Sequence, residues 1–129
     1  MTEARCACGA LVVAVTGDPL RVAICHCDAC RARTGSAFSW NARFAAEQVV
    51  LPEGSRSFAR IGDEGSEIVD HFCPDCGSTV WYTNSEMEGV AIPAGALVRA
   101  QDLPAPEVSV YDERRPGWLT LASTMERWD

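Results

Sequence analysis

The chain has 129 residues, of which 47% are hydrophobic and 22% are charged, the size and composition of one globular domain with its own hydrophobic core. Its formal charge of −7 argues against nucleic acid as a partner, because phosphate binding needs clustered basic residues. No apolar run approaches the length that spans a membrane, and residues 1–9 lack the basic and then apolar pattern of a secretory signal. We therefore expect a cytoplasmic protein with no membrane partner.

Short apolar runs separated by turn residues organise the first half of the chain. Runs of about four to eight residues with this punctuation are typical of β-strands. The ranges that we expect to be strands are 10–16, 20–25, 37–44 and 48–51. Between the second and third of these, residues 27–34 have room for a helical turn or two.

The second half of the chain continues this pattern and contains the clearest hairpin. Residues 56–61 and 67–72 flank the segment 62–65, which predicts two strands joined by a turn in which Asp63 and Glu64 are solvated. The remaining expected elements are strands at 78–83, 90–93 and 107–111 and a helical turn or two near 96–102. With no linker or repeat, the sequence predicts a single mainly β domain of small packed antiparallel sheets.

Cysteine is where the sequence departs most from an average composition. The chain has seven cysteines, at positions 6, 8, 25, 27, 30, 73 and 76. A disulfide framework would favour an even number spread along a secreted chain, whereas here the number is odd and the cysteines are clustered. Clustered thiols without an export signal indicate metal binding instead.

Two tight cysteine pairs lie far apart in the sequence, and each is followed by a glycine that can adopt a positive φ, Gly9 and Gly77. The spacing within a pair allows both sulfurs to reach one ion at about 2.3 Å, and tetrahedral zinc takes four ligands. The sequence therefore predicts one structural zinc site made by Cys6, Cys8, Cys73 and Cys76. This closed site would tie the N-terminal segment to the middle of the chain and contribute directly to folding.

The remaining three cysteines, Cys25, Cys27 and Cys30, lie in one short segment. Three thiolates cannot complete a zinc tetrahedron, so the fourth ligand must be water, a substrate thiol or another side chain. His26, His71 or a carboxylate could close the site, but the interpretation that we favour is an exchangeable fourth position, as in catalytic zinc. An all-thiolate site is soft and prefers a thiol substrate, which zinc would hold as a nucleophilic thiolate.

Several segments in a fixed order carry a resemblance to a known family. They are Cys6-x-Cys8-Gly9, Cys25-His26-Cys27-x-x-Cys30-Arg31, Thr34-Gly35-Ser36-Ala37-Phe38, Phe72-Cys73-x-x-Cys76-Gly77, Pro93-Ala94-Gly95 and Pro116-Gly117-Trp118. Together they resemble the glutathione-dependent formaldehyde-activating enzyme (Gfa) family, and seven cysteines in register make the resemblance specific. It implies one zinc domain over residues 1–129 with a β-tent fold stapled by zinc, similar to that of a zinc-binding chaperone of Rab-type GTPases.

The resemblance also implies an activity, that of a zinc-dependent carbon–sulfur lyase that condenses glutathione with formaldehyde to S-hydroxymethylglutathione. It agrees with a structural zinc on the four-cysteine group and a catalytic zinc on the other three cysteines. Arg31 and Arg33 are then candidates to bind the carboxylates of glutathione, or to offset the charge of the trithiolate. Trp40 is a candidate for the substrate wall, and His26 is a candidate to relay a proton. The other aromatic residues, Trp81, Tyr82, Trp118 and Trp128, are expected to pack in the core.

Two departures from the family pattern lie outside the metal ligands. Glu107 stands where many relatives carry a histidine, and residues 123–127 replace the usual acidic-Leu-Pro ending. Two functions of other classes also stay open. One is a binding module that uses zinc only as a scaffold, and the other is a thiol redox sensor whose cysteine trio releases zinc on oxidation. We expect a homodimer as a means of covering exposed strand edges.

Overall fold

The computed structural model describes residues 1–129, with 39% of the chain in strands and one α-helix, and it confirms the mainly β class predicted from the sequence. The strands are β1 (Thr2–Arg5), β2 (Val12–Val15), β3 (Arg21–Cys25), β4 (Ser39–Phe44), β5 (Val49–Val50), β6 (Arg56–Ile61), β7 (Glu67–Phe72), β8 (Thr79–Asn84), β9 (Val90–Pro93), β10 (Val108–Val110) and β11 (Glu126–Trp128). The helices are α1 (Asp28–Thr34) and the short 3-10 helices η1 (Ala46–Gln48), η2 (Ala94–Ala96), η3 (Ala100–Asp102) and η4 (Asp112–Arg114). None of them is both long and apolar enough to cross a membrane.

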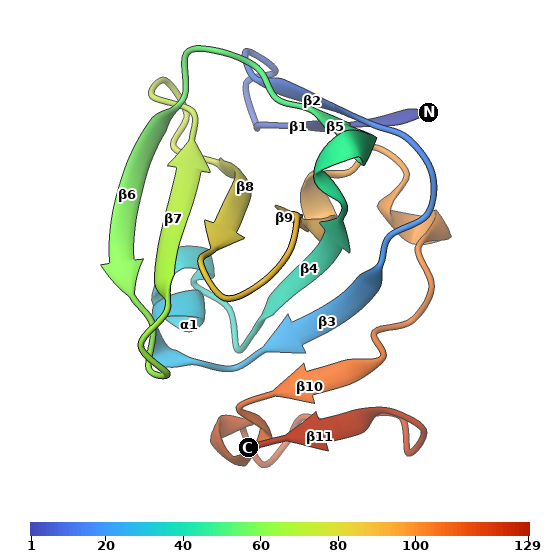
Figure 1. Cartoon of the computed structure of the whole chain (residues 1–129). Coiled ribbons are helices and arrows are strands. Elements are labelled where there is room, and N and C mark those ends of the chain that lie inside the picture. Colours follow the sequence, from blue (N-terminus) through green and yellow to red (C-terminus); the bar gives the residue numbers. More distant parts are fainter.

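The strands form two sheets, and Figure 1 shows the smaller one at the top of the molecule. The small sheet has the order β1-β2-β5, and the large sheet has eight strands in the order β11-β10-β3-β4-β9-β8-β7-β6. Most neighbouring strands are antiparallel, as predicted, but β10 runs parallel to both β3 and β11. A parallel pair needs a long connection, which here is all of the chain between β3 and β10.

The boundaries of the central elements follow the sequence pattern closely. The hairpin strands β6 and β7 have the predicted bounds, 56–61 and 67–72, and α1 lies within the segment with room for a helical turn or two. β1 and β11 were not predicted, because both are short and polar. β1 forms because it pairs residue for residue with β2, starting with Thr2 opposite Val15. Long-range pairing thus outweighs a weak local preference.

The hydrophobic core joins the small sheet to one face of the large sheet. The cluster consists of Ala4, Cys6, Leu11, Val13, Val15, Val22, Ala42, Phe44, Cys73, Val80, Trp81, Val90, Ile92 and Leu97. Within β3, Val22 and Ile24 are buried, whereas Arg21, Ala23 and Cys25 are only half-buried. Because side chains of a strand alternate between its two faces, β3 turns one face to the core and leaves the other for a site.

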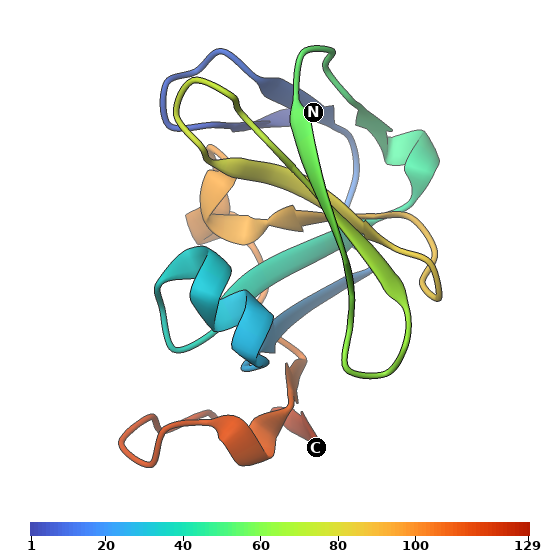
Figure 2. The same cartoon turned by 90° about the vertical axis from the view of Figure 1, so that its left-hand side faces the viewer.

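The large sheet curls, so that residues from its two ends approach each other. Figures 1 and 2 show the β6–β7 hairpin and α1 on one side of the molecule, with β10 and β11 at its lower end. Ile68 of β7 and Val110 of β10, which belong to opposite ends of the sheet, line the same pocket. The curl therefore builds a pocket from segments that are distant in the sequence.

The expectation that the remaining aromatic residues pack in the core is correct for Trp81 but wrong for two other tryptophans. Trp81 is 5% exposed, whereas Trp118 is 77% exposed and Trp128 is 40% exposed. Trp118 lies outside any strand, and Trp128 lies on the edge strand β11, so neither has a second layer to cover it. Tyr82 faces the pocket that the curled sheet forms.

Candidate active site

The four cysteines that were predicted to share one ion lie together on the β1–β2 and β7–β8 loops. The sulfur atoms within 4.8 Å of one another belong to Cys6, Cys8, Cys73 and Cys76. Cys8 Sγ lies 3.7 Å from both Cys6 Sγ and Cys73 Sγ. Four sulfurs at 2.3 Å from a central zinc ion would lie about 3.8 Å apart, so these separations fit tetrahedral coordination. This group can hold a metal ion that connects the small sheet to the large one.

The two loops of the four-cysteine group have the same local geometry. Gly9 N–H donates to Cys6 O at 3.0 Å, and Gly77 N–H donates to Cys73 O at 2.8 Å. Both glycines have a φ of 79°, which is the left-handed conformation that glycine adopts without steric cost. Leu11 N–H donates to Cys6 Sγ at 3.2 Å, and a bond of this kind stabilises a thiolate.

The other three cysteines surround the junction between β3 and α1. Cys25 is the last residue of β3, Cys27 is the N-cap of α1, and Cys30 lies in the first turn of the helix. Their sulfur atoms lie within 4.8 Å of one another. Cys30 N–H donates to Cys27 Sγ at 3.3 Å, so a sulfur takes the place of the usual N-cap oxygen. The start of the helix therefore brings the cysteine trio together.

The three thiols of the trio hold their protons unevenly. Hydrogen bonds from Cys25 and Cys30 lower the pKa of Cys27 to about 2. The same hydrogen bond to Cys27 raises the pKa of Cys25. A hydrogen bond from Cys25 lowers the pKa of Cys30, but its bond to Cys27 and its burial outweigh this and leave that pKa raised. Cys27 is thus the thiol of the trio that loses its proton most readily, and a metal ion that binds all three sulfurs displaces the protons of Cys25 and Cys30.

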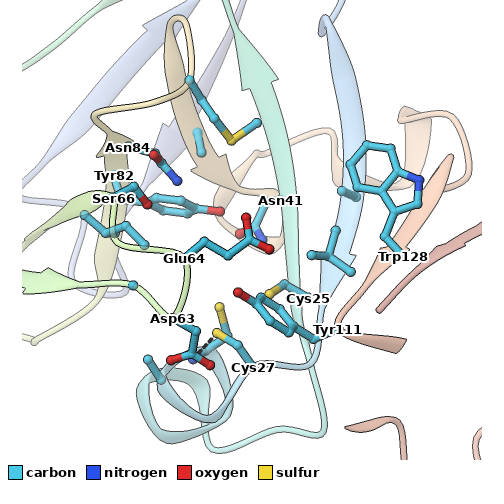
Figure 3. Close-up of a pocket in the computed structure, with 18 of the residues that line it drawn as sticks. Cys25, Cys27, Asn41, Asp63, Glu64, Ser66, Tyr82, Asn84, Tyr111 and Trp128 are labelled. Carbon is cyan, nitrogen blue, oxygen red and sulfur yellow. Dashed lines mark hydrogen bonds between the residues drawn. The ribbon is translucent and has the colours of Figure 1, made fainter. Parts of the chain in front are cut away.

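No histidine nitrogen or carboxylate oxygen lies within 4.8 Å of all three sulfurs of the trio. His71, one of the residues considered as a fourth ligand, lies on β7 with its ring stacked on Trp81 at 4.5 Å between centroids. All three cysteines of the trio line one wall of a pocket of about 260 Å³, which Figure 3 shows in close-up. The trio therefore opens on a pocket and not on another protein ligand.

Alternate residues of β3 and β4 form another wall of this pocket. Arg21, Ala23 and Cys25 of β3 line it together with Asn41 and Arg43 of β4. The residues between them face the core, as the two-residue period of a strand requires. This wall was not predicted, although both strands were. Counting alternate positions back from Cys25 would have identified Arg21 as a site residue.

His26 does not line the pocket, although it lies between two cysteines of the trio. It is fully buried, with Nε2 2.9 Å from Ser109 Oγ and Nδ1 3.3 Å from Ala37 O. Ser109 Oγ in turn donates to Asp112 Oδ1 at 2.8 Å. Burial lowers the pKa of His26, which favours a neutral ring. Because both ring nitrogens face protein partners, this placement does not support the predicted proton relay.

The three predicted substrate contacts also lie outside the pocket lining. Arg31 forms an ion pair with Asp28 on the exposed surface of α1. The Arg33 guanidinium lies over the Tyr82 ring, 5.5 Å from its centroid. Trp40 packs against the core, because the next residue along β4 faces the pocket. Of the three side chains, the Arg33 guanidinium contacts a residue of the pocket wall, Tyr82.

The turn between β6 and β7 bends over the pocket. Asp63 and Glu64 are both exposed, as predicted, and they also line this pocket. Figure 3 shows the Glu64 carboxylate projecting into the pocket between Tyr82 and Tyr111. Arg114 Nη1 donates to Asp63 Oδ2 at 2.8 Å and connects the turn to η4. The lining of the pocket thus contains acidic groups as well as the arginines of β3 and β4.

A comparison with models of protein families matches most of the chain. The family model described as glutathione-dependent formaldehyde-activating enzyme matches residues 1–114 of the 129. No curated protein sequence matches the chain. The matched range includes both cysteine groups and all of the pocket wall except Trp128 and Asp129. The chain therefore belongs to the glutathione-dependent formaldehyde-activating enzyme family.

Proposed function

We propose that the chain catalyses the addition of a small thiol such as glutathione to formaldehyde, as a carbon–sulfur lyase of the S-hydroxymethylglutathione synthase type. The observation that carries this proposal is the cysteine trio, which lines a pocket and has no fourth ligand from the protein. A purely structural zinc protein would need only the four-cysteine group. The description of the family, which names both glutathione and formaldehyde, supports the same two reactants.

The donor atoms at both cysteine groups suit zinc, which takes thiolate ligands in tetrahedral sites. In this proposal the structural zinc is held by Cys6, Cys8, Cys73 and Cys76, and the catalytic zinc is held by Cys25, Cys27 and Cys30. When bound by the trio, zinc would supply the positive charge that keeps a substrate thiol deprotonated near neutral pH. The other residues of the pocket would then orient the thiol and the aldehyde.

Arg21 is the residue that we propose as the anchor for a carboxylate of the thiol. It forms none of the ion pairs of the chain, and its guanidinium lies 5.1 Å from the centroid of the Trp128 ring. The other two arginines of the pocket have partners, since Arg60 lies 4.0 Å from Asp70 and Arg43 donates to a backbone carbonyl at 3.1 Å. An unpaired guanidinium is the better binding site for a carboxylate, because both arms of its planar fork are free to donate to the two oxygens.

Two further groups suit the rest of a small peptide. Asn41 is 7% exposed, and its Nδ2 donates to Ser39 Oγ at 2.8 Å, but its Oδ1 has no hydrogen-bond partner. A buried acceptor without a partner is costly, and a peptide N–H of the ligand would satisfy it. The Glu64 carboxylate suits an ammonium group. With Arg21, these groups complement a peptide thiol that carries both a carboxylate and an ammonium group.

For His26 and Arg33 we propose positioning roles. The backbone N–H of His26 donates to Val110 O at 3.0 Å, and the ring Nε2 lies 2.9 Å from Ser109 Oγ. This residue therefore fixes the cysteine loop to β10. Arg33 lies over the ring of Tyr82 and keeps this wall of the pocket in place. Neither role requires contact with the substrate.

The test combines metal content with the rate of the reaction. We would measure zinc per chain in reducing buffer for the wild type and for Cys27→Ser, with and without glutathione. We would also measure the exchange of formaldehyde with S-hydroxymethylglutathione by NMR. The condensation also runs without a catalyst, so the activity of the protein is the increase in exchange rate at equilibrium above the uncatalysed rate. We expect two zinc ions in the wild type, one in Cys27→Ser, and faster exchange with the wild type alone.

Other outcomes would identify the other functions. One zinc ion in both proteins, with no effect on exchange, would contradict the proposal and indicate a zinc-stabilised binding module. Reversible zinc release under mild peroxide, with a large conformational change and no faster exchange, would indicate a redox sensor. Wild-type protein stripped of zinc by a chelator and then reloaded serves as the control for metal-dependent activity.

A further inference from the structure

Tyr111 has the one strained backbone conformation among the non-glycine residues of the chain. Its φ is 53° and its ψ is 45°, and it is the residue that connects β10 to η4. A bulky side chain rarely adopts this left-handed conformation. Where such a conformation persists, it often lies at a functional site, because the surrounding structure must hold it in place.

The strained backbone brings the Tyr111 side chain to the cysteine trio. β10 pairs with β3 so that Val110 lies opposite Cys25, and His26 N–H donates to Val110 O at 3.0 Å. If β10 continued as a regular strand, Tyr111 and Val110 would point to opposite faces of the sheet. Both residues nevertheless line the pocket. The left-handed turn therefore directs the phenol to the same side as Cys25, as Figure 3 shows.

A contact with Arg114 also holds the Tyr111 ring. The Arg114 guanidinium lies over this ring, 4.7 Å from its centroid. Arg114 donates to Asp63 Oδ2 at 2.8 Å and lies 3.7 Å from Asp28 Oδ1, so it is fixed to both the β6–β7 turn and the start of α1. The ring has little freedom to leave the pocket, and its orientation is set before any ligand binds.

The hydroxyl group of Tyr111 is free to donate. None of the hydrogen bonds within the chain uses it. Burial raises the pKa of Tyr111, and the negative charges of Glu64 and Asp63 raise it further. The phenol therefore keeps its proton at neutral pH, beside the three cysteines that would hold the catalytic zinc.

We propose that Tyr111 is a catalytic residue whose O–H group donates to the oxygen of the aldehyde while the thiol adds to its carbon. This inference rests on the proposed function. As the sulfur–carbon bond forms, the π electron pair of the carbonyl moves to the oxygen, which takes the phenol proton. Water then returns a proton to the phenolate, and the proton that the thiol lost on binding leaves to solvent. The sum is thiol plus aldehyde giving the hydroxymethyl adduct, with no further reactant.

The kinetic test uses the fact that the chain has only two tyrosines and that both line the pocket. Tyr111→Phe keeps the ring, the backbone and the contact with Arg114, and removes only the hydroxyl. We expect it to lower the catalysed exchange rate at saturating glutathione by about 100-fold, with little change in the KM for glutathione. Tyr82→Phe is the matched comparison, and we expect it to have the smaller effect on this rate.

A second test does not depend on the reaction rate. With carbon-13 at Cζ of both tyrosines, the NMR spectrum contains two signals, and Tyr111→Phe identifies one of them. On zinc-loaded protein, glutathione together with formaldehyde should shift the Tyr111 signal, whereas glutathione alone should shift it much less. The shift reports contact between the phenol and the added oxygen at equilibrium.

The outcomes separate this inference from the proposed function. If zinc-loaded wild type does not accelerate exchange, the proposed function fails and the role of Tyr111 fails with it. If the wild type is active, but Tyr111→Phe matches it within about twofold and the Tyr111 signal does not respond to formaldehyde, only the role of Tyr111 is overturned. A large loss of rate in Tyr82→Phe alone would transfer the role to Tyr82.

Discussion

The two cysteine groups of this chain use the same ligand atom in two different settings. In the four-cysteine group, the ligands come from two loops that are distant in the sequence, and Cys6 and Cys73 belong to the hydrophobic core. In the trio, all ligands come from the end of one strand and the start of the next helix, and they line a pocket. Ligands from two segments can surround an ion, whereas ligands from one segment approach it from one side. The first arrangement is suited to a cross-link and the second to a site for a substrate.

Breaking the four-cysteine group should have the largest effect on the protein. Zinc binding to small structural sites has an apparent free energy of about 10–16 kcal/mol, which matches the entire stability of a typical domain, about 5–15 kcal/mol. We therefore expect Cys73→Ser to lose cooperative folding. Circular dichroism during heating would measure this. A sharp thermal transition near the wild-type temperature would contradict the role of this group as a cross-link between the sheets.

The matched change in the trio should leave the fold in place. Cys27→Ser removes a metal ligand, but a serine hydroxyl is a good N-cap and can accept the Cys30 N–H that the sulfur accepts now. We expect a thermal transition much closer to the wild type than that of Cys73→Ser, with loss of one zinc ion and of catalysed exchange. Unfolding comparable to that of Cys73→Ser would show that both groups are structural.

The pH dependence of zinc binding should distinguish the two cysteine groups further, because metal binding at the trio requires the loss of two protons. Hydrogen bonding to Cys27 raises the pKa of Cys25, and Cys30 also has a raised pKa, so both are protonated near neutral pH. The pKa of Cys27 is lowered to about 2, so this residue has no proton to lose. Zinc affinity at the trio should therefore rise with pH, by about 100-fold per pH unit.

Competition with a chromophoric chelator between about pH 6 and 8 would measure this slope. Cys27→Ser is the control, because it leaves only the four-cysteine group to compete. A slope near tenfold per pH unit would mean that one proton is released, and the distribution of charge described for the trio would then be incorrect.

The smallest effect concerns the arginines near the trio. Arg21→Ala should raise the KM for glutathione about tenfold, because it removes an unpaired cation from the pocket wall. Arg31→Ala should change this KM less than about twofold, because Arg31 pairs with Asp28 on the surface of α1. The dependence of exchange rate on glutathione concentration measures both values. The reverse order would return the carboxylate anchor to the helix, as the sequence suggested.

Much of the fold followed from local patterns in the sequence. The β6–β7 hairpin has its predicted bounds, because short strand-like segments on both sides of a glycine-bounded turn indicate it. β1 and β11 were missed because their residues have little preference for strands, and they form only against a partner. The parallel pairing of β10 with β3 was missed for a related reason, since no short segment contains the information for it.

For the site, the sequence by itself determined which cysteines act together, because two short spacings limit how far each sulfur can lie from its neighbour. Only the tertiary structure decided which other residues line the pocket beside the trio. Arg21 of β3, Tyr82 of β8 and Tyr111 directly after β10 are distant in the sequence, and the curl of the large sheet brings them to one pocket. Hydrogen bonds between distant strands and one strained residue produce that arrangement, and neither leaves a periodic signal in the sequence.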